Sequence, residues 1–153
     1  MVELEVLGVR IDLPDHQPVL LLKEVGGARL LPVWIGAADA AAIVEIIEGA
    51  DRHRRSVHAI LINVARSLHL ELAARITGFD EGVFGGELQL GSQVYECRPS
   101  DLARISLVAE VPLHCPASLM AEVGVEPGKP PEDEVERFRE FLDQVSPDDF
   151  QSG

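Results

Sequence analysis

The sequence predicts an α+β fold, in which a mixed, mainly antiparallel sheet is packed with helices and an appended C-terminal helix follows. Strand-like segments occur in two groups, and helical segments follow each group instead of alternating with single strands. A chain of 153 residues is long enough for one well-buried core and too short for two. We therefore predict one domain over residues 1–125, followed by an acidic linker and helix over residues 126–153.

The first third of the chain is predicted to be an antiparallel meander. Apolar residues recur at every second position of the first strand, with a slip at Gly8 of the kind that a β-bulge produces. The pair Gly26-Gly27 tolerates positive φ and favours a tight turn between the second and third strands. The predicted strands are 2–12, 19–23 and 29–35.

Two helices are predicted next, one over 37–48 and one that Ser56 caps with its hydroxyl. The apolar spacing of the second helix predicts an inward face made of Ile60, Leu61, Val64, Ala65 and Leu68. A second antiparallel set and a third helix, capped by Ser100, follow. The remaining predicted elements are strands 71–79, 83–90 and 93–97, an extended segment 112–115, a helical turn 117–122, a Gly/Pro-rich linker 124–131 and a helix 132–144.

Composition limits the classes of function. The formal net charge of −13 argues against broad, sequence-independent binding of duplex DNA, so that any contact with nucleic acid should be local. No apolar run approaches the roughly 18 residues of a membrane span. The acidic residues Glu3 and Glu5 are unlike a secretory signal and predict a cytoplasmic protein. Cys97 and Cys115 are interpreted as reduced, buried small hydrophobic residues.

Basic residues gather at two predicted helix entrances within this acidic chain. The first entrance, residues 51–58, contains three arginines and two histidines, and the second is Arg98-Pro99-Ser100-Asp101. Unpaired N–H groups and the helix dipole already favour an anion at such places. We predict phosphate binding by Arg54, Arg55, Ser56, Arg98 and Ser100. The alternative for the arginines is pairing with carboxylates, and Arg98 and Asp101 are close enough in sequence to bond each other.

Three segments together resemble the bifunctional nuclease family. They are Leu31-Pro32-Val33-Trp34-Ile35-Gly36-Ala37-Ala38-Asp39-Ala40-Ala41-Ala42-Ile43, Arg55-Ser56-Val57-His58 and Glu96-Cys97-Arg98-Pro99-Ser100-Asp101-Leu102-Ala103. The resemblance covers residues 2–125 and implies an α+β domain, a homodimer and hydrolysis of DNA and RNA. This chain departs from the family pattern at Ala59, where the family has an acidic residue. Asp39 and Glu96 also stand where the family more often has Glu and Asp, respectively.

Candidate catalytic residues are His58 and Asp101. In the first turn of a helix His58 is favoured as a neutral ring, able to act as a general base or a metal ligand, or simply to bond nearby backbone. The acids Asp39, Glu45, Glu96 and Asp101 are candidates for holding Mg²⁺ or Mn²⁺, with Asp39 and Glu96 as the metal pair. Asp39 and Asp101 are equally explained as acids that stabilise a first helical turn. No motif indicates an organic cofactor.

These features predict nuclease-type hydrolysis of phosphodiester bonds in a homodimeric protein, with a divalent metal as the candidate cofactor. The alternative is a non-catalytic dimeric module that binds a small anionic ligand or a partner protein through the same arginines. The two hypotheses differ in one geometric requirement, because catalysis needs a single cleft that is lined by Arg55, His58, Arg98 and an acid.

Overall fold

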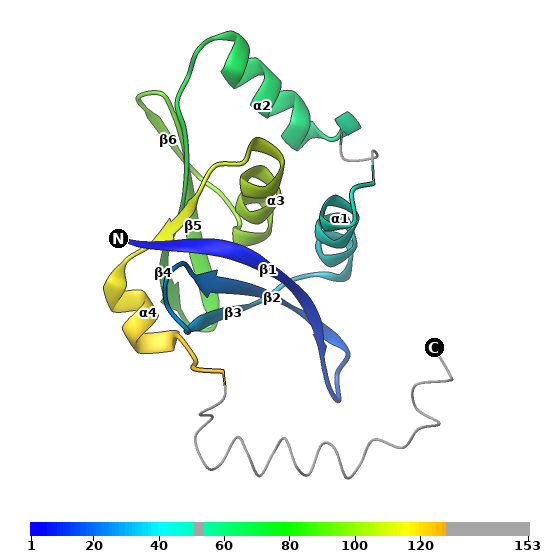
Figure 1. The fold of residues 1–153 in the computed structure, drawn as a ribbon, viewed down its shortest axis with the longest axis vertical. Helices are drawn as coiled ribbons and strands as arrows, with labels where there is room; N and C mark the ends of the chain where they lie inside the picture. Colours follow the sequence, from blue (N-terminus) through cyan, green and yellow to red (C-terminus); the bar gives the residue numbers. More distant parts are fainter. Residues whose placement is uncertain (51–53, 128–153) are drawn as a thin grey trace.

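The computed structural model describes residues 1–50 and 54–127, which form a seven-stranded sheet with four helices (Figure 1). Residues 51–53, and with them Arg52 and His53 of the basic cluster, lie outside the described part. So does the predicted helix 132–144. The mixed sheet and its helices confirm the predicted α+β class. Within the described residues, no helix is long and apolar enough to span a membrane.

The predicted meanders form the two halves of the sheet. The first half contains β1 (Val2–Asp12), β2 (Gln17–Glu24) and β3 (Leu30–Trp34), paired in antiparallel order. The second contains β4 (Leu72–Asp80), β5 (Val83–Leu90) and β6 (Gln93–Glu96), also antiparallel. The register of β1 against β2 shifts between Val6 and Gly8, and this shift confirms the predicted bulge.

A short strand joins the two halves. β7 (Leu113–Cys115) pairs antiparallel with β1 and parallel with β4, which gives the strand order β3-β2-β1-β7-β4-β5-β6. Leu113 and Cys115 are completely buried, and His114 between them is half-buried. The sequence predicted an extended segment here but not its central place, since three residues carry no information about their pairing partners.

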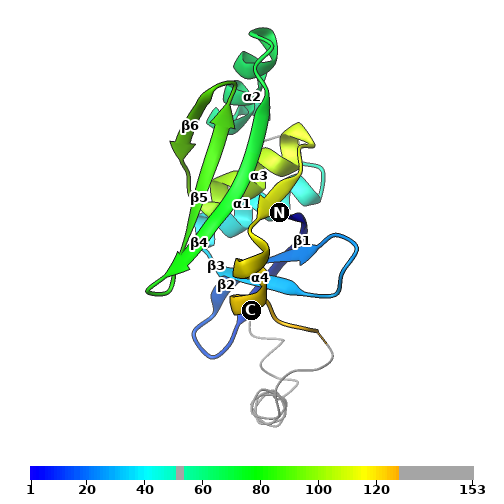
Figure 2. The same cartoon turned by 90° about the vertical axis from the view of Figure 1, so that its left-hand side faces the viewer.

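Four helices complete the domain: α1 (Ala37–Ile47), α2 (Val57–Ser67), α3 (Pro99–Ala109) and α4 (Ala117–Val123). The helix α3 contacts α1, α2 and strands β4 and β5, so it occupies the middle of the helical layer. Its residues Leu102, Ala103 and Ile105 are almost completely buried in the core. Figures 1 and 2 place α2 toward one end of the molecule and α4 toward the other.

The inward face predicted for α2 is confirmed at Ala65 and at the partly buried Leu61, but it is wrong at the other three residues. The helix buries Ala59, Ile62 and Ala65, whereas Ile60, Val64 and Leu68 are exposed. Small alanine side chains let α2 lie close to α3, and Arg66 donates from Nη2 to the carbonyl of Ala109 at 3.0 Å near the far end of both helices. The larger residues are therefore left on the outer side of α2, where the described residues do not cover them.

Both cysteines are free thiols, as predicted. Cys115 is buried in the core and Cys97 is half-buried. Burial, the largest influence on each group, raises the pKa of both thiols. They are therefore held in the protonated, poorly nucleophilic form. The cytoplasmic location stays a prediction.

Candidate active site

A continuous chain of hydrogen bonds links the first turns of three helices. His58 lies 2.8 Å, through Nε2, from Oδ1 of Asp101. Arg98 donates to both oxygens of Asp101, from Nε to Oδ2 at 2.8 Å and from Nη2 to Oδ1 at 3.1 Å. The same guanidinium donates to Asp39 at 3.0 and 3.3 Å. Asp39 and Arg98 are 59 residues apart in the sequence, and the packing of α1 against α3 brings them together.

Local sequence places each of these side chains at a helix start. Arg98 is the N-cap of α3, Pro99 supplies the favoured proline in the first turn, and Asp101 is the acid of that turn. Asp39 is the corresponding acid in the first turn of α1. Ser56 caps α2 by accepting a hydrogen bond from the backbone N–H of Ala59 at 3.2 Å, as predicted, which sets His58 in the first turn.

The electrostatics of the network stabilise its charged forms. Burial raises the pKa of Asp101, but hydrogen bonds from Arg98 and His58 and the charge of Arg98 lower it, and the net pKa lies below the ordinary value of 3.8. The hydrogen bonds and charge of Asp101, with the charge of Asp39, raise the pKa of Arg98 above its already high ordinary value. Asp101 is therefore ionised and Arg98 charged throughout the physiological range.

The ionised state of Asp101 determines which ring nitrogen of His58 carries the donated proton. An ionised carboxylate can only accept hydrogen bonds, so Nε2 of His58 carries the proton that it donates. In the neutral ring Nδ1 is then the unprotonated nitrogen. This atom is buried and has no hydrogen-bond partner. Asp101 thus orients the imidazole and leaves one basic nitrogen uncommitted, which is the arrangement that a proton-transfer group requires.

The remaining predicted phosphate ligands differ in their placement. Arg54 and Arg55 lie in the short turn that leads into α2, directly before the cap, and both are exposed. The two basic helix entrances therefore meet through the contact between His58 and Asp101.

Ser100 does not cap α3, because Arg98 occupies the cap, and at 4% exposure its side chain is buried instead of facing a phosphate. The predicted serine cap of α3 is therefore wrong, and the buried Ser100 hydroxyl is not a phosphate ligand in the proposed site.

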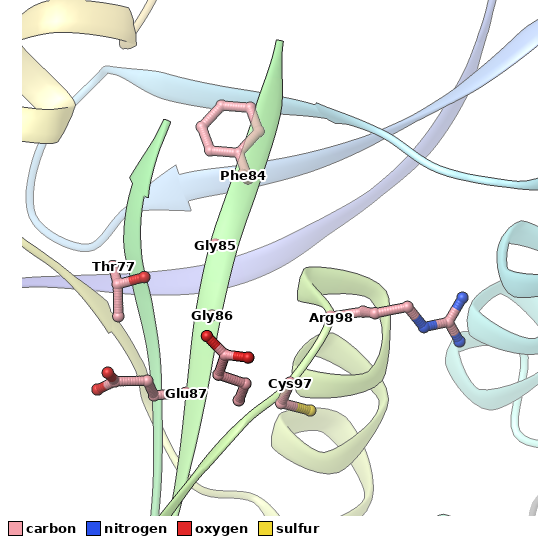
Figure 3. Close-up of a pocket in the computed structure, with 8 residues that line it drawn as sticks. Thr77, Phe84, Gly85, Gly86, Glu87, Cys97 and Arg98 are labelled. Atoms are coloured by element: carbon pink, nitrogen blue, oxygen red, sulfur yellow. The ribbon is translucent and has the colours of Figure 1, made fainter. Parts of the chain in front are cut away.

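Glu96 lies on the opposite face of the sheet from Asp39. It is the strand partner of Glu87, which lies between the buried residues Gly86 and Leu88 and so points away from the core. A cavity of about 340 Å³ adjoins this region. Figure 3 shows Arg98 at its edge with the guanidinium pointing away from the other lining residues, toward a neighbouring helix. The eight lining residues are Thr77, Phe84, Gly85, Gly86, Glu87, Glu96, Cys97 and Arg98.

The donor set does not fit the predicted metal. Asp39 and Glu96, the expected pair, do not converge, and nowhere in residues 1–50 and 54–127 do three His, Cys, Asp or Glu side chains gather to hold an ion. Asp39 and Asp101 do converge, but the guanidinium of Arg98 takes the place between them that a cation would occupy. The structure thus corrects the pairing of Asp39 with Glu96: the partner of Asp39 is Arg98.

Sequence reasoning missed a further arginine at the site. Arg104 lies three residues after Asp101 on α3, and its Nε is the other buried side-chain atom without a hydrogen-bond partner in the described part of the chain. The signal that could have identified it is the i, i+3 spacing from Asp101, since residues with that spacing are neighbours on a helix surface.

A mixed sheet of two meanders, with a His–Asp–Arg–Asp network at three helix starts, defines an α+β domain with a candidate anion site. The chain belongs to the bifunctional nuclease domain family, whose model matches residues 20–128. It is similar to two proteins of Mycobacterium tuberculosis, the uncharacterized protein Rv1829 of strain ATCC 25618 / H37Rv and the uncharacterized protein MT1877 of strain CDC 1551 / Oshkosh. Each is 38% identical over 163 residues, a match that covers 99% of this chain and 99% of the relative.

Proposed function

We propose that this protein hydrolyses phosphodiester bonds of nucleic acid at the network formed by His58, Asp101, Arg98 and Asp39. The observation that carries the proposal is the orientation of His58 by an ionised carboxylate beside an exposed arginine, at a point where three helix starts meet. Membership of the bifunctional nuclease domain family supports the same class of reaction.

Each residue has a separate role in the proposal. Arg98, whose side chain is 64% exposed, binds a nonbridging phosphate oxygen, and the exposed Arg55 and Arg54 bind the strand beside it. His58 is the catalytic residue: it accepts at Nδ1 the proton of the attacking water, whose oxygen bonds to phosphorus. The bond from phosphorus to the leaving oxygen breaks, and that oxygen takes a proton from solvent. Asp101 is a positioning residue, because it holds both His58 and Arg98. Since Nδ1 is buried, the first turn of α2 has to move for water to reach it.

The donor geometry also predicts how the reaction responds to metal removal. Because the guanidinium of Arg98 already bridges Asp39 and Asp101, we expect cleavage of single-stranded DNA or RNA by the wild-type protein to persist in EDTA. Gel analysis of end-labelled strands, incubated with EDTA or with Mg²⁺ or Mn²⁺, measures this directly.

Three outcomes of that assay are informative. Cleavage in EDTA supports a reaction carried out by the protein's own residues. Cleavage lost in EDTA and restored by Mg²⁺ or Mn²⁺ would mean that a cation displaces the guanidinium from the two aspartates. The absence of cleavage of both DNA and RNA under all conditions would refute hydrolysis.

Two observations favour a second function. Arg98 uses hydrogen bonds on both edges of its guanidinium within the protein, and Ala59 replaces the acid expected after His58. A non-catalytic module that binds a small anionic ligand or a partner protein needs no acid at that position. This alternative predicts binding without cleavage in the same assay.

We also propose that the protein is a homodimer that forms through the outer face of α2. Four apolar side chains on this face, Val57, Ile60, Val64 and Leu68, are between 48% and 76% exposed. Their spacing places them along one side of the helix, and exposed apolar stripes of this kind mark interfaces. A second copy offers the same stripe, as a two-fold interface requires.

Replacing Val64 by glutamate is expected to convert the dimer to a monomer, because two opposed carboxylates would then lie within an apolar contact. Light scattering coupled to size-exclusion chromatography measures the molar mass. The matched control is Val83→Glu, which changes an exposed valine at the start of β5 and should leave the mass unchanged. A wild-type protein that is monomeric at all concentrations tested would contradict the proposal.

A further inference from the structure

Arg104 carries a positive charge that the described protein does not compensate. Its Nε is buried without a hydrogen-bond partner, and no salt bridge of Arg104 exists among the described residues. A buried donor without an acceptor is destabilising, and such atoms in native proteins call for an explanation. The terminal nitrogens of Arg104 are not among the buried unpaired atoms, so they are the part of the guanidinium that solvent reaches.

The position of Arg104 places this charge beside the candidate active site. It follows Asp101 by one helical turn, whereas the intervening Leu102 and Ala103 point into the core. Asp101 is not its partner, since the carboxylate of Asp101 accepts its three hydrogen bonds from His58 and Arg98. The terminal nitrogens of Arg104 therefore have no acceptor within the described residues and are open to an anion from solution.

We propose that Arg104 binds a second phosphate group of a single nucleic-acid strand, adjacent to the phosphate held at Arg98. The inference rests on the proposed function, since it uses the same site. Arginine suits this role because its planar fork matches the oxygens of a phosphate. The N-cap of α3 and Arg104 are six residues apart, or about 9 Å along a helix axis, and the guanidinium of Arg98 is held between Asp39 and Asp101, so we assign the two arginines to successive phosphates. The site thereby favours a strand over a mononucleotide.

The test measures strand binding over a salt series. Binding of a fluorescently labelled single-stranded oligonucleotide is followed by anisotropy, with all variants made in a His58→Gln background that keeps the strand intact. Each phosphate contact to a single strand contributes about 0.7 to the slope of log Kd against log salt concentration. Arg104→Gln should therefore lower the slope by about 0.7 and weaken binding about fivefold at low salt.

Two further variants make the result specific. Arg104→Lys keeps the charge and should retain most of the slope. Arg75→Gln removes the same charge from the other face of the sheet, where Arg75 lies 3.9 Å from Glu87, and should leave the slope unchanged. Thermal unfolding of each variant checks that the fold is preserved.

The outcomes separate this inference from the proposed hydrolysis. A slope lowered by about 0.7 in Arg104→Gln and unchanged in Arg75→Gln supports the second phosphate contact, even if the wild-type protein fails to cleave the strand. Equal slopes in Arg104→Gln and Arg75→Gln would overturn it, even if the wild-type protein cleaves. A His58→Gln protein that does not bind the strand at all would overturn it as well.

Discussion

Replacing Arg98 by glutamine is expected to lower both the stability of the fold and the rate of strand cleavage. The substitution leaves the carboxylates of Asp39 and Asp101 facing each other without the cation that separates them. Charge-assisted hydrogen bonds contribute roughly 1.5–3 kcal/mol each when buried, and solvent weakens those of an exposed arginine. We therefore expect a loss of about 2 kcal/mol in the free energy of unfolding, measured by urea denaturation.

The effect on cleavage should be larger than the effect on stability. Arg98 binds the phosphate in the proposed reaction and also fixes Asp101, which orients His58. Removing one donor that stabilises developing charge costs about 10²–10³ in rate in comparable sites. We expect a loss of that size in the initial rate of cleavage, measured at a temperature where the variant is still folded.

A second arginine provides the matched control. Arg29 makes a two-point contact with Glu24, at 3.1 and 3.2 Å, in the connection between β2 and β3. Arg29→Gln breaks an ion pair of the same kind and should destabilise the fold without reducing cleavage beyond that expected from unfolding. Equal rate losses in Arg29→Gln and Arg98→Gln would show that Arg98 has only a structural role.

Local features of the fold were predictable from the sequence. The bulge at Gly8, the serine cap of α2 and the order of strands and helices each depend on residues within a few positions of one another. The insertion of β7 between β1 and β4 was not predictable, since it depends on pairings between segments far apart in the chain. The rotation of α2 about its axis was likewise not predictable, since it depends on packing against α3, and Ile60, Val64 and Leu68 are exposed instead of inward.

The candidate site was predictable only in part, for the same reason. The prediction that Arg98 and Asp101 bond each other is confirmed, because they are three residues apart at a helix start. The bond from Arg98 to Asp39 and the contact of His58 with Asp101 arise from helix packing, which no spacing in the sequence reveals. Glu96 was expected beside Asp39, but the strand register turns it to the other face of the sheet.

Replacing His58 is expected to have the largest effect on cleavage. A positioned general base contributes about 10²–10⁴ to the rate of proton transfer in enzymes. His58→Gln removes the basic Nδ1 but keeps an amide that can donate to Asp101, so that the network and the fold should survive. His58→Ala removes both. The matched control is His69→Ala, which changes an exposed histidine in the loop after α2.

The most direct test of the account is the cleavage rate of one labelled single strand by wild-type, His58→Gln and His69→Ala proteins, purified identically and confirmed as folded. We predict that His58→Gln loses at least about 10² in rate, whereas His69→Ala cleaves at the wild-type rate. Cleavage by His58→Gln at the wild-type rate would contradict the assignment of proton transfer to His58.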